Sequence, residues 1–227
     1  MSDPKNVAIV AAKELRDAVR NRWFLLYAGI FTVLSVGLSF LSSLGAASYG
    51  QVGYGRTAAV LVNLVALIVP LMALNVGAAS IAAERERGTL AYLLAQPLDR
   101  GELLLGKFLG LAIALAAALA GGFGVSAAAL AIAGARGDVG SFGTLVALSM
   151  VLALAMLAVG LLVSSLAPRA SVAAGVSVAL WLTFVLLTDL GLMGGSLVFK
   201  LGAPQLLHIA LANPLQVFKL AVLSRLN

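Results

Sequence analysis

Five long runs without a charged residue constrain this chain more than any other feature of its sequence. The runs are Trp23–Gly55, Thr57–Ala83, Phe108–Ala135, Val139–Pro168 and Ala170–Thr188. A helix needs roughly 20 mainly apolar residues to cross the hydrocarbon core of a bilayer, and every run reaches about that length. A transmembrane β-barrel would need short alternating segments of about ten residues, which this sequence lacks. The sequence therefore predicts an all-α integral membrane protein.

We expect five spanning helices, covering approximately residues 23–44, 58–82, 106–133, 142–166 and 171–195. The composition agrees, because 62% of the residues are hydrophobic and 11% are charged. A soluble domain carries about 25% charged residues to cover its surface. Residues 1–227 therefore form a single transmembrane domain in this interpretation.

Lysine and arginine are distributed unequally between the two sides that alternating spans define. Ten are expected on the side of the N-terminus: Lys5, Lys13, Arg16, Arg20, Arg22, Arg85, Arg87, Arg100, Lys107 and Arg169. Five are expected on the other side: Arg56, Arg136, Lys200, Lys219 and Arg225. Cytoplasmic loops are enriched in both residue types, so we expect a multi-pass protein with a cytoplasmic N-terminus. Attraction to anionic lipid headgroups accounts for the net charge of +6 without a nucleic-acid partner.

Residues 5–22 predict an amphipathic helix ahead of the first span. Its apolar face carries Val7, Val10, Ala11, Leu15, Ala18 and Val19. Its polar face carries Lys13, Arg16, Asp17 and Arg20. Such a helix can lie in the plane of the membrane interface. We favour this placement over a simple cytoplasmic extension of the first span.

The stretch Glu84–Lys107, between the second and third spans, holds eight of the 24 charged residues. Pro97 ends a short apolar segment within it, because proline cannot continue a helix. We therefore expect a short helix at Glu86–Gln96 within a cytoplasmic loop, residues 84–105. Such a helix can transmit a push from a soluble partner into the bilayer. The alternative is a surface helix that rests on lipid headgroups.

Two further patterns occur at the end of this loop. Asp99 and Glu102 have the spacing of a capping box, which predicts a defined start for the third span. The segment from Gly101 to Lys107 matches the first seven positions of a nucleotide-binding P-loop, but Phe108 stands where the motif needs Ser or Thr. We therefore expect no nucleotide site in this chain. The spans also carry no Ser/His/Asp set and no paired carboxylates for hydrolysis, so we expect no catalytic residues and no enzymatic activity.

Polar residues within the spans offer few other sites. Asn63 and Asn75 are candidates for a transport pathway or for packing, and helix–helix hydrogen bonding is the plainer account. For Asp189, near the far end of the fifth span, we favour an interfacial or packing role over a pathway role. His208 is the only histidine and the chain has no cysteine, so we expect no metal site.

The segment 204–226 is expected to be an amphipathic or re-entrant element on the outer side. Its charge-free part is too short for a crossing, and Asn213 and Pro214 interrupt it. Five spans followed by such a segment predict that the sixth span of a six-span unit is missing from this chain.

Two segments resemble the ABC-2 class of ABC transporter permeases: KELRDAVRNRW at residues 13–23 and GTLAYLLAQPLDRGELLLGKFLG at residues 88–110. The resemblance implies a type V exporter-like transmembrane domain, in which residues 5–22 form an elbow helix. It assigns to that elbow helix the residues Lys13, Arg16, Asp17, Arg20 and Arg22. It also implies that the loop holds a coupling helix, which docks in a cleft of an ATPase subunit. The coupling residues would be Glu86, Arg87, Gly88, Thr89, Leu90, Tyr92, Leu93, Leu94, Pro97 and Arg100.

Within that class the sequence is most similar to the NosY permeases of NosDFY systems, which mature nitrous oxide reductase. Four segments carry this likeness: RNRW at residues 20–23, GTLAYLLAQPLDRGELLLGKF at 88–108, ALWLTFVLLTDL at 179–190 and NPLQVFKL at 213–220. The segment at 88–108 is the most specific of them. It implies a bacterial or archaeal cytoplasmic (inner) membrane and a homodimer. The implied partners are a NosF-like ATPase, which would hold ATP and magnesium, and a periplasmic NosD-like protein. The implied task is assembly of a copper–sulfur site, with no cofactor bound by this chain. An ABC-2 exporter of a lipid, drug or peptide and a membrane scaffold without an ATPase remain alternatives.

Overall fold

The computed structural model describes residues 4–47, 54–90, 99–134, 139–197, 208 and 211–226. These residues form α-helices and contain no strand. The helices are α1 (Pro4–Arg20), α2 (Arg22–Ala47), α3 (Tyr54–Glu86), α5 (Arg100–Ile132), α6 (Val139–Leu166), α7 (Ala170–Leu197) and α9 (Pro214–Leu226). Helices α2, α3, α5, α6 and α7 are long and apolar enough to cross a membrane. The prediction of an all-α protein with five spans is confirmed.

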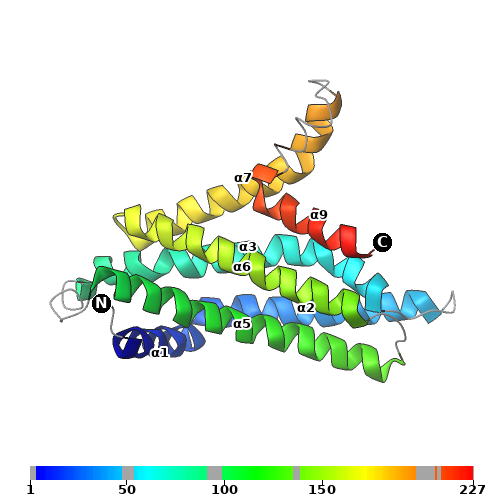
Figure 1. Ribbon diagram of the computed structural model, residues 1–227, viewed down its shortest axis with the longest axis horizontal. Helices are drawn as coiled ribbons and strands as arrows, with labels where there is room; N and C mark the ends of the chain where they lie inside the picture. The colour runs from blue at the N-terminus through cyan, green and yellow to red at the C-terminus, as the bar shows by residue number, and fades with distance from the viewer. Residues whose placement is uncertain are drawn as a thin grey trace.

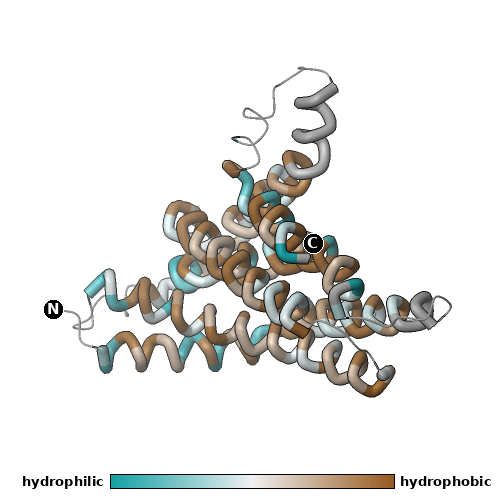
Figure 2. Tube along the Cα trace, turned by 45° about the vertical axis from the view of Figure 1, so that its right-hand side comes forward, coloured by the Kyte–Doolittle hydropathy of each residue, from teal (hydrophilic) through white to brown (hydrophobic). Residues whose placement is uncertain are grey.

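Helix α3 lies at the centre of the bundle (Figure 1). It packs along α6, with α2 and α5 on one side and α7 and α9 on the other. The end of α3, the start of α5 and the turn between α6 and α7 lie at the same end of the bundle as α1 (Figure 1). We call this end the α1 end. Hydrophobic residues cover most of the length of the spans (Figure 2), as a bilayer-spanning bundle requires.

Aromatic contacts hold the interior together. Phe31 of α2 packs edge-on against Phe123 of α5, with ring centroids 5.2 Å apart, and both side chains are buried. Phe123 contacts Phe142 of α6 in the same manner at 5.9 Å. Edge-to-face pairs of this kind are favourable beyond the area they bury. These rings therefore fix α2, α5 and α6 to one another.

Asn21 separates α1 from the first span. Its side-chain oxygen accepts hydrogen bonds from the backbone N–H groups of Trp23 (2.9 Å) and Phe24 (3.4 Å), which caps the start of α2. Helix α1 is therefore a helix of its own and not an extension of α2. It packs along the start of α5. Its placement in the membrane plane stays a prediction.

Glycines permit the closest helix contacts. A Cβ atom on Gly106 would lie 2.6 Å from the Cβ of Val10, and one on Gly110 would lie 2.4 Å from the carbonyl oxygen of Ala11. Gly106 and Gly110 are thus the positions at which α1 packs closely against α5. Between α3 and α6, a Cβ on Gly160 would lie 2.6 Å from the carbonyl oxygen of Leu74. Small residues allow such backbone approach between membrane helices.

The described part of the segment 204–226 packs against the spans. Asn213 caps α9 by accepting from the Leu215 N–H at 3.0 Å, and it donates to the carbonyl of Phe184 in α7 at 2.8 Å. Leu215, Phe218 and Val222 are buried in the core, and α9 contacts both α3 and α6. Helix α9 therefore packs on the bundle through these three side chains. The rest of the segment lies largely outside the described residues.

The contact between α3 and α6 gives a first prediction. Gly160→Ala should destabilise the protein by about 1–3 kcal/mol, because the added methyl meets backbone atoms that cannot move aside. Gly143→Ala in the same helix is the matched control, since nothing lies within 4 Å of the position that its methyl group would occupy. The control should be neutral or slightly stabilising, because alanine favours a helix over glycine. Thermal unfolding in detergent measures both, and equal melting temperatures would refute the close contact.

Candidate functional site

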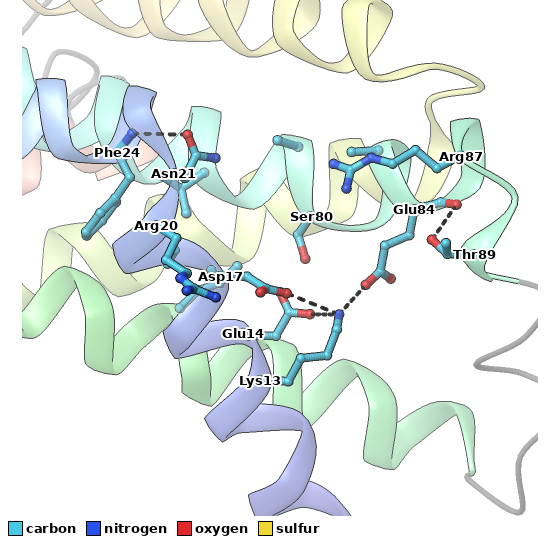
Figure 3. Close-up of a pocket in the computed structure, with 15 residues that line it drawn as sticks. Lys13, Glu14, Asp17, Arg20, Asn21, Phe24, Ser80, Glu84, Arg87 and Thr89 are labelled. Atoms are coloured by element: carbon cyan, nitrogen blue, oxygen red, sulfur yellow. Dashed lines mark hydrogen bonds and ion pairs between the residues drawn. The ribbon is translucent and has the colours of Figure 1, made fainter.

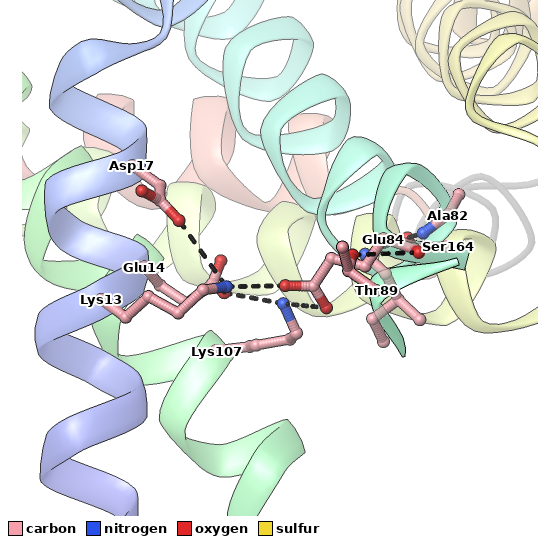
Figure 4. A network of polar contacts seen from close by, with 9 residues as sticks. Lys13, Glu14, Asp17, Ala82, Glu84, Thr89, Lys107 and Ser164 are labelled. Atoms are coloured by element: carbon pink, nitrogen blue, oxygen red, sulfur yellow. Dashed lines mark hydrogen bonds and ion pairs between the residues drawn. The ribbon is translucent and has the colours of Figure 1, made fainter. Parts of the chain in front are cut away.

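Two lysines and two glutamates form an ion-pair cluster near the α1 end of the bundle (Figure 4). Lys107 of α5 is fully buried, and its Nζ lies 2.7 Å from Oε1 of Glu14 in α1. The same Nζ lies 2.8 Å from Oε2 of Glu84 in α3. Lys13 of α1 contacts the other oxygen of Glu84 at 2.7 Å and Oε1 of Glu14 at 3.1 Å. The four side chains, which we call the charged junction, therefore join α1, α3 and α5 with balanced charge.

Lys13 is the exposed member of the junction, with 44% of its side chain accessible. Its Nζ also lies 3.6 Å from Oδ2 of Asp17. Burial lowers the pKa of Lys13, but the hydrogen bond to Glu84 and the charge of Glu14 outweigh it. The pKa of Lys13 is therefore raised above its ordinary value. Lys13 stays charged throughout the physiological range, and so does its attraction to the two glutamates.

The position of Glu14 explains how the junction forms. Glu14 is only 7% exposed because it lies on the side of α1 that packs against α5. Gly110 makes room for it, since a Cβ there would lie 2.8 Å from the Cβ of Glu14. A buried charge without a partner costs several kcal/mol, and the opposite charge of Lys107 offsets that cost. The close approach of α1 to α5 and the ion pair therefore depend on each other.

Local sequence determines where α3 ends, next to the junction. Gly88 has a φ of +74°, a left-handed conformation that glycine adopts without strain and that commonly ends a helix. Thr89 then donates from its hydroxyl to the carbonyl of Glu84 at 3.2 Å (Figure 3). Helix α3 thus continues through Glu86, where the sequence predicts the start of the loop helix. Helical residues resume at Thr89 and Leu90, and residues 91–98 lie outside the described part of the chain.

The same end of α3 is bound to the turn between α6 and α7. Arg85 donates to the carbonyl of Ser165 at 2.9 Å and to that of Ala167. Glu86 accepts from the N–H of Ala170, the first residue of α7, at 3.0 Å. The hydroxyl oxygen of Ser164 accepts from the backbone N–H groups of Ile81 and Ala82, each at 2.9 Å. The residues that lead into the loop are therefore tied to α6 and α7 as well as to α1 and α5.

The start of α5 agrees with the sequence. Asp99 and Glu102 form the predicted capping box. The Asp99 side chain accepts from the backbone N–H of Glu102, and the Glu102 side chain accepts from the backbone N–H of Asp99. Glu102 also accepts from the side-chain amide of Asn6 in α1 at 3.1 Å. The segment that resembles a P-loop is helical and belongs to α5. Its Lys107 binds carboxylates, so it is not free to hold a phosphate.

The other predicted residues divide between the junction, the surface and the undescribed part of the chain. Lys13 belongs to the junction and Asp17 lies beside it, whereas Arg16, Arg20, Arg22, Arg87 and Arg100 are exposed. Tyr92, Leu93, Leu94 and Pro97 lie outside the described residues, as does the side chain of Asp189. Asn63 is exposed, and Asn75 donates to the carbonyl of Leu71 in its own helix at 3.0 Å. Asn75 therefore shows no helix–helix bond in the described structure, and His208 is exposed.

Sequence reasoning missed the three most buried members of the junction. Glu14 interrupts the apolar face of α1, and a carboxylate at such a position signals a buried partner. Lys107 gives the matching signal, because it stands among leucines and Phe108. Glu84 stands at the boundary of an apolar span. These charged residues in apolar surroundings indicate buried ion pairs, but the sequence does not show which residue pairs with which.

Across the described residues, no group of three or more His, Cys, Asp or Glu side chains is arranged to hold a metal ion. The two carboxylates of the junction and the carboxylate of Asp17 all lie beside lysines. The chemistry that this arrangement supports is electrostatic attachment between helices.

This chain is similar to known proteins along almost its whole length. The profile of the ABC-2 family transporter proteins matches residues 8–227. A probable ABC transporter permease protein NosY from Pseudomonas aeruginosa is 43% identical over an alignment 227 residues long. The aligned region covers 95% of this chain and 80% of that protein. A protein of the same description from Stutzerimonas stutzeri is 39% identical over 225 residues, with the same two coverages.

The charged junction gives a second prediction. Lys107→Met should destabilise the protein by roughly 3–5 kcal/mol, because two buried carboxylates then share only Lys13. Lys13→Met should cost less than about 1 kcal/mol, because Lys13 is half-exposed and Lys107 remains. Thermal unfolding of the purified variants measures the difference.

A double variant tests whether charge balance is the cause. Glu84→Gln added to Lys107→Met leaves one lysine and one glutamate, so it should be less destabilised than the sum of its single changes. If the two losses simply add, the side chains act through packing and the electrostatic account fails.

Proposed function

We propose, since this chain belongs to the ABC-2 family of transporter proteins, that it couples ATP hydrolysis by a partner ATPase to work across the membrane. The chain is a multi-pass membrane permease subunit: the family profile covers almost all of it, and its relatives are described as permeases. In this proposal the chain has no nucleotide site of its own. The ATPase would bind ATP and magnesium.

The observation that carries the proposal is the set of attachments at the end of α3. Glu84 binds α1 and α5, and the next two residues, Arg85 and Glu86, bind the α6–α7 turn. The loop from Glu86 to Arg100 leaves from this point and returns to α5. A force applied to the loop therefore reaches five helices through charged or hydrogen-bonded contacts within one or two turns. A surface helix that only rests on lipid would need no such attachments.

The orientation of the chain in the membrane follows from this role. The α1 end is the cytoplasmic end in our proposal, because the ATPase works there and most basic residues belong there. We expect the chain and its ATPase at the cytoplasmic membrane of a bacterium. Gly88 and Thr89, which are exposed, and the segment Leu90–Pro97 that follows them would form the contact with the ATPase in this proposal.

At a finer level we propose a role like that of the NosY permeases. Relatives described as NosY are 43% and 39% identical to this chain along 95% of its length. In that role two copies of the chain work with a NosF-like ATPase and a NosD-like periplasmic protein in assembling the copper–sulfur site of nitrous oxide reductase. The spans are poor in soft metal ligands, with no cysteine in the whole sequence. A sulfur species as cargo, or mechanical signalling alone, suits them better than a copper pathway.

Replacing the segment 89–94 with a polar linker of equal length tests the coupling. The variant should still insert into the membrane, because the charge-free spans are intact. It should lose the ATPase on affinity purification. An equal replacement of residues 135–138, between α5 and α6, is the control and should retain the ATPase. Equal recovery of the ATPase by both variants would remove the coupling assignment.

The proteins recovered with the unmodified chain separate the three functions. An ATPase together with a NosD-like β-helical protein supports the maturation role. An ATPase alone supports an exporter of a lipid, drug or peptide. Recovery of neither supports a membrane scaffold.

A third prediction separates docking from transmission. Arg85→Gln removes the contacts with the carbonyls of Ser165 and Ala167, while the residues of the loop stay unchanged. The variant should bind the ATPase normally but lose most of the ATP-dependent activity of the complex. Arg169→Gln is the control, because the side chain of Arg169 is exposed and makes no ion pair within the described residues. Normal activity of the Arg85→Gln complex would show that this contact does not transmit the push.

A further inference from the structure

A cavity of about 580 Å³ lies beside the charged junction, between α1, the start of α2 and the last turns of α3 (Figure 3). Its residues on α3 recur at helical spacing and change in character along the helix. Val76, Ala79 and Ala83 come first, and Glu84 and Arg87 follow. From Val76 to Arg87 the helix rises roughly 16 Å. The wall of the cavity thus passes from apolar to charged over the depth of a lipid headgroup and its upper chain.

Two arginines of this cavity have no ion-pair partner in the described structure. Arg20 lies at the end of α1 and Arg87 lies just past the end of α3 (Figure 3). The acidic residues nearby are engaged otherwise: Glu14 and Glu84 bind both lysines, and Asp17 lies near Lys13. Arg20 lies beside Asn21 and Phe24, Arg87 lies beside Glu84 and Thr89, and Ser80 lies between the two arginines in this view (Figure 3). Both guanidinium groups therefore belong to the cavity wall and are not neutralised by a carboxylate of the described residues. Arginine suits phosphate oxygens, because its planar group offers several N–H donors.

The apolar end of the cavity supplies a second, independent observation. Phe24 and Leu111 form part of its lining, and both are buried within the bundle. Ser80 lies between the two ends, and its hydroxyl oxygen is buried with no hydrogen-bond partner among the described residues. A buried hydroxyl without a partner costs free energy. A phosphate oxygen that reached it would accept its hydrogen bond.

We propose that this cavity binds an anionic phospholipid of the membrane, with the phosphate at Arg20 and Arg87 and the start of an acyl chain against Phe24 and Val76. A free phosphate ion would satisfy the arginines but would leave the apolar end empty, so the lipid is the better fit. The bound lipid would lie directly beside Lys13 and Glu84. This proposal concerns a lipid site and does not depend on the partner ATPase or on the cargo.

The test uses the full chain in a neutral detergent, with dioctanoyl phosphatidylglycerol as the probe and native mass spectrometry as the readout. Arg20→Gln combined with Arg87→Gln should weaken binding by roughly 30-fold, because two basic contacts with the phosphate are lost. Arg16→Gln combined with Arg22→Gln is the matched control, since both residues are exposed and neither lines the cavity. The control removes the same charge and should bind like the unmodified chain. Equal affinities for the two double variants would overturn the proposal.

Two further arms identify the occupant. Inorganic phosphate should fail to displace the lipid, and displacement at comparable concentration would show a site for free phosphate instead. Ala79→Phe fills the apolar wall while both arginines remain, so it should abolish lipid binding. Its unfolding temperature without lipid is measured alongside, so that loss of the site is distinguished from loss of the fold. Unchanged lipid binding by a folded Ala79→Phe variant would also overturn the proposal.

Discussion

The buried ammonium group of Lys107 is the constraint on which the α1 end of the molecule depends. A lysine with no exposed side-chain surface must be neutralised where it lies, because an unpaired charge away from water is costly. The two carboxylates that neutralise it come from α1 and α3. Helix α5 therefore cannot keep Lys107 buried unless both neighbours are in place. The burial of this one side chain thus sets a single condition, which is that α1, α3 and α5 all pack together.

Small residues make this condition achievable. Gly106 and Gly110 remove the side chains that would hold α1 away from α5. The approach of the two backbones brings Glu14 within 2.7 Å of Lys107. Apolar packing without the glycines would leave the carboxylate short of its partner, and the glycines without the ion pair would leave a buried charge. Packing and electrostatics therefore specify the same register of α1 on α5.

What the sequence could predict follows from the range of each interaction. The spans and the capping box of Asp99 and Glu102 depend on residues close together in the chain, so length and spacing sufficed. The junction joins Lys13 to Glu84 over 71 residues and Glu14 to Lys107 over 93, and no local pattern encodes such pairs. The end of α3 shows a smaller difference. The sequence predicted that a loop helix starts at Glu86, but α3 itself extends to Glu86, and the left-handed Gly88 follows its end.

The distribution of contacts also bears on how a push on the loop would spread. Helix α3 meets α6 through direct backbone contact at Gly77 and Gly160, so these two helices cannot slide past each other without clashing. The junction and the bonds of Arg85 and Glu86 lie a few turns further along the same helix. A force at this end therefore moves α1, α3, α5 and α6 together instead of bending one helix. Movement would then be taken up where packing is sparse, and among the described residues α7 is the span with the smallest buried share. Arg85 and Glu86 hold the α6–α7 turn, so such movement would be taken up further along α7.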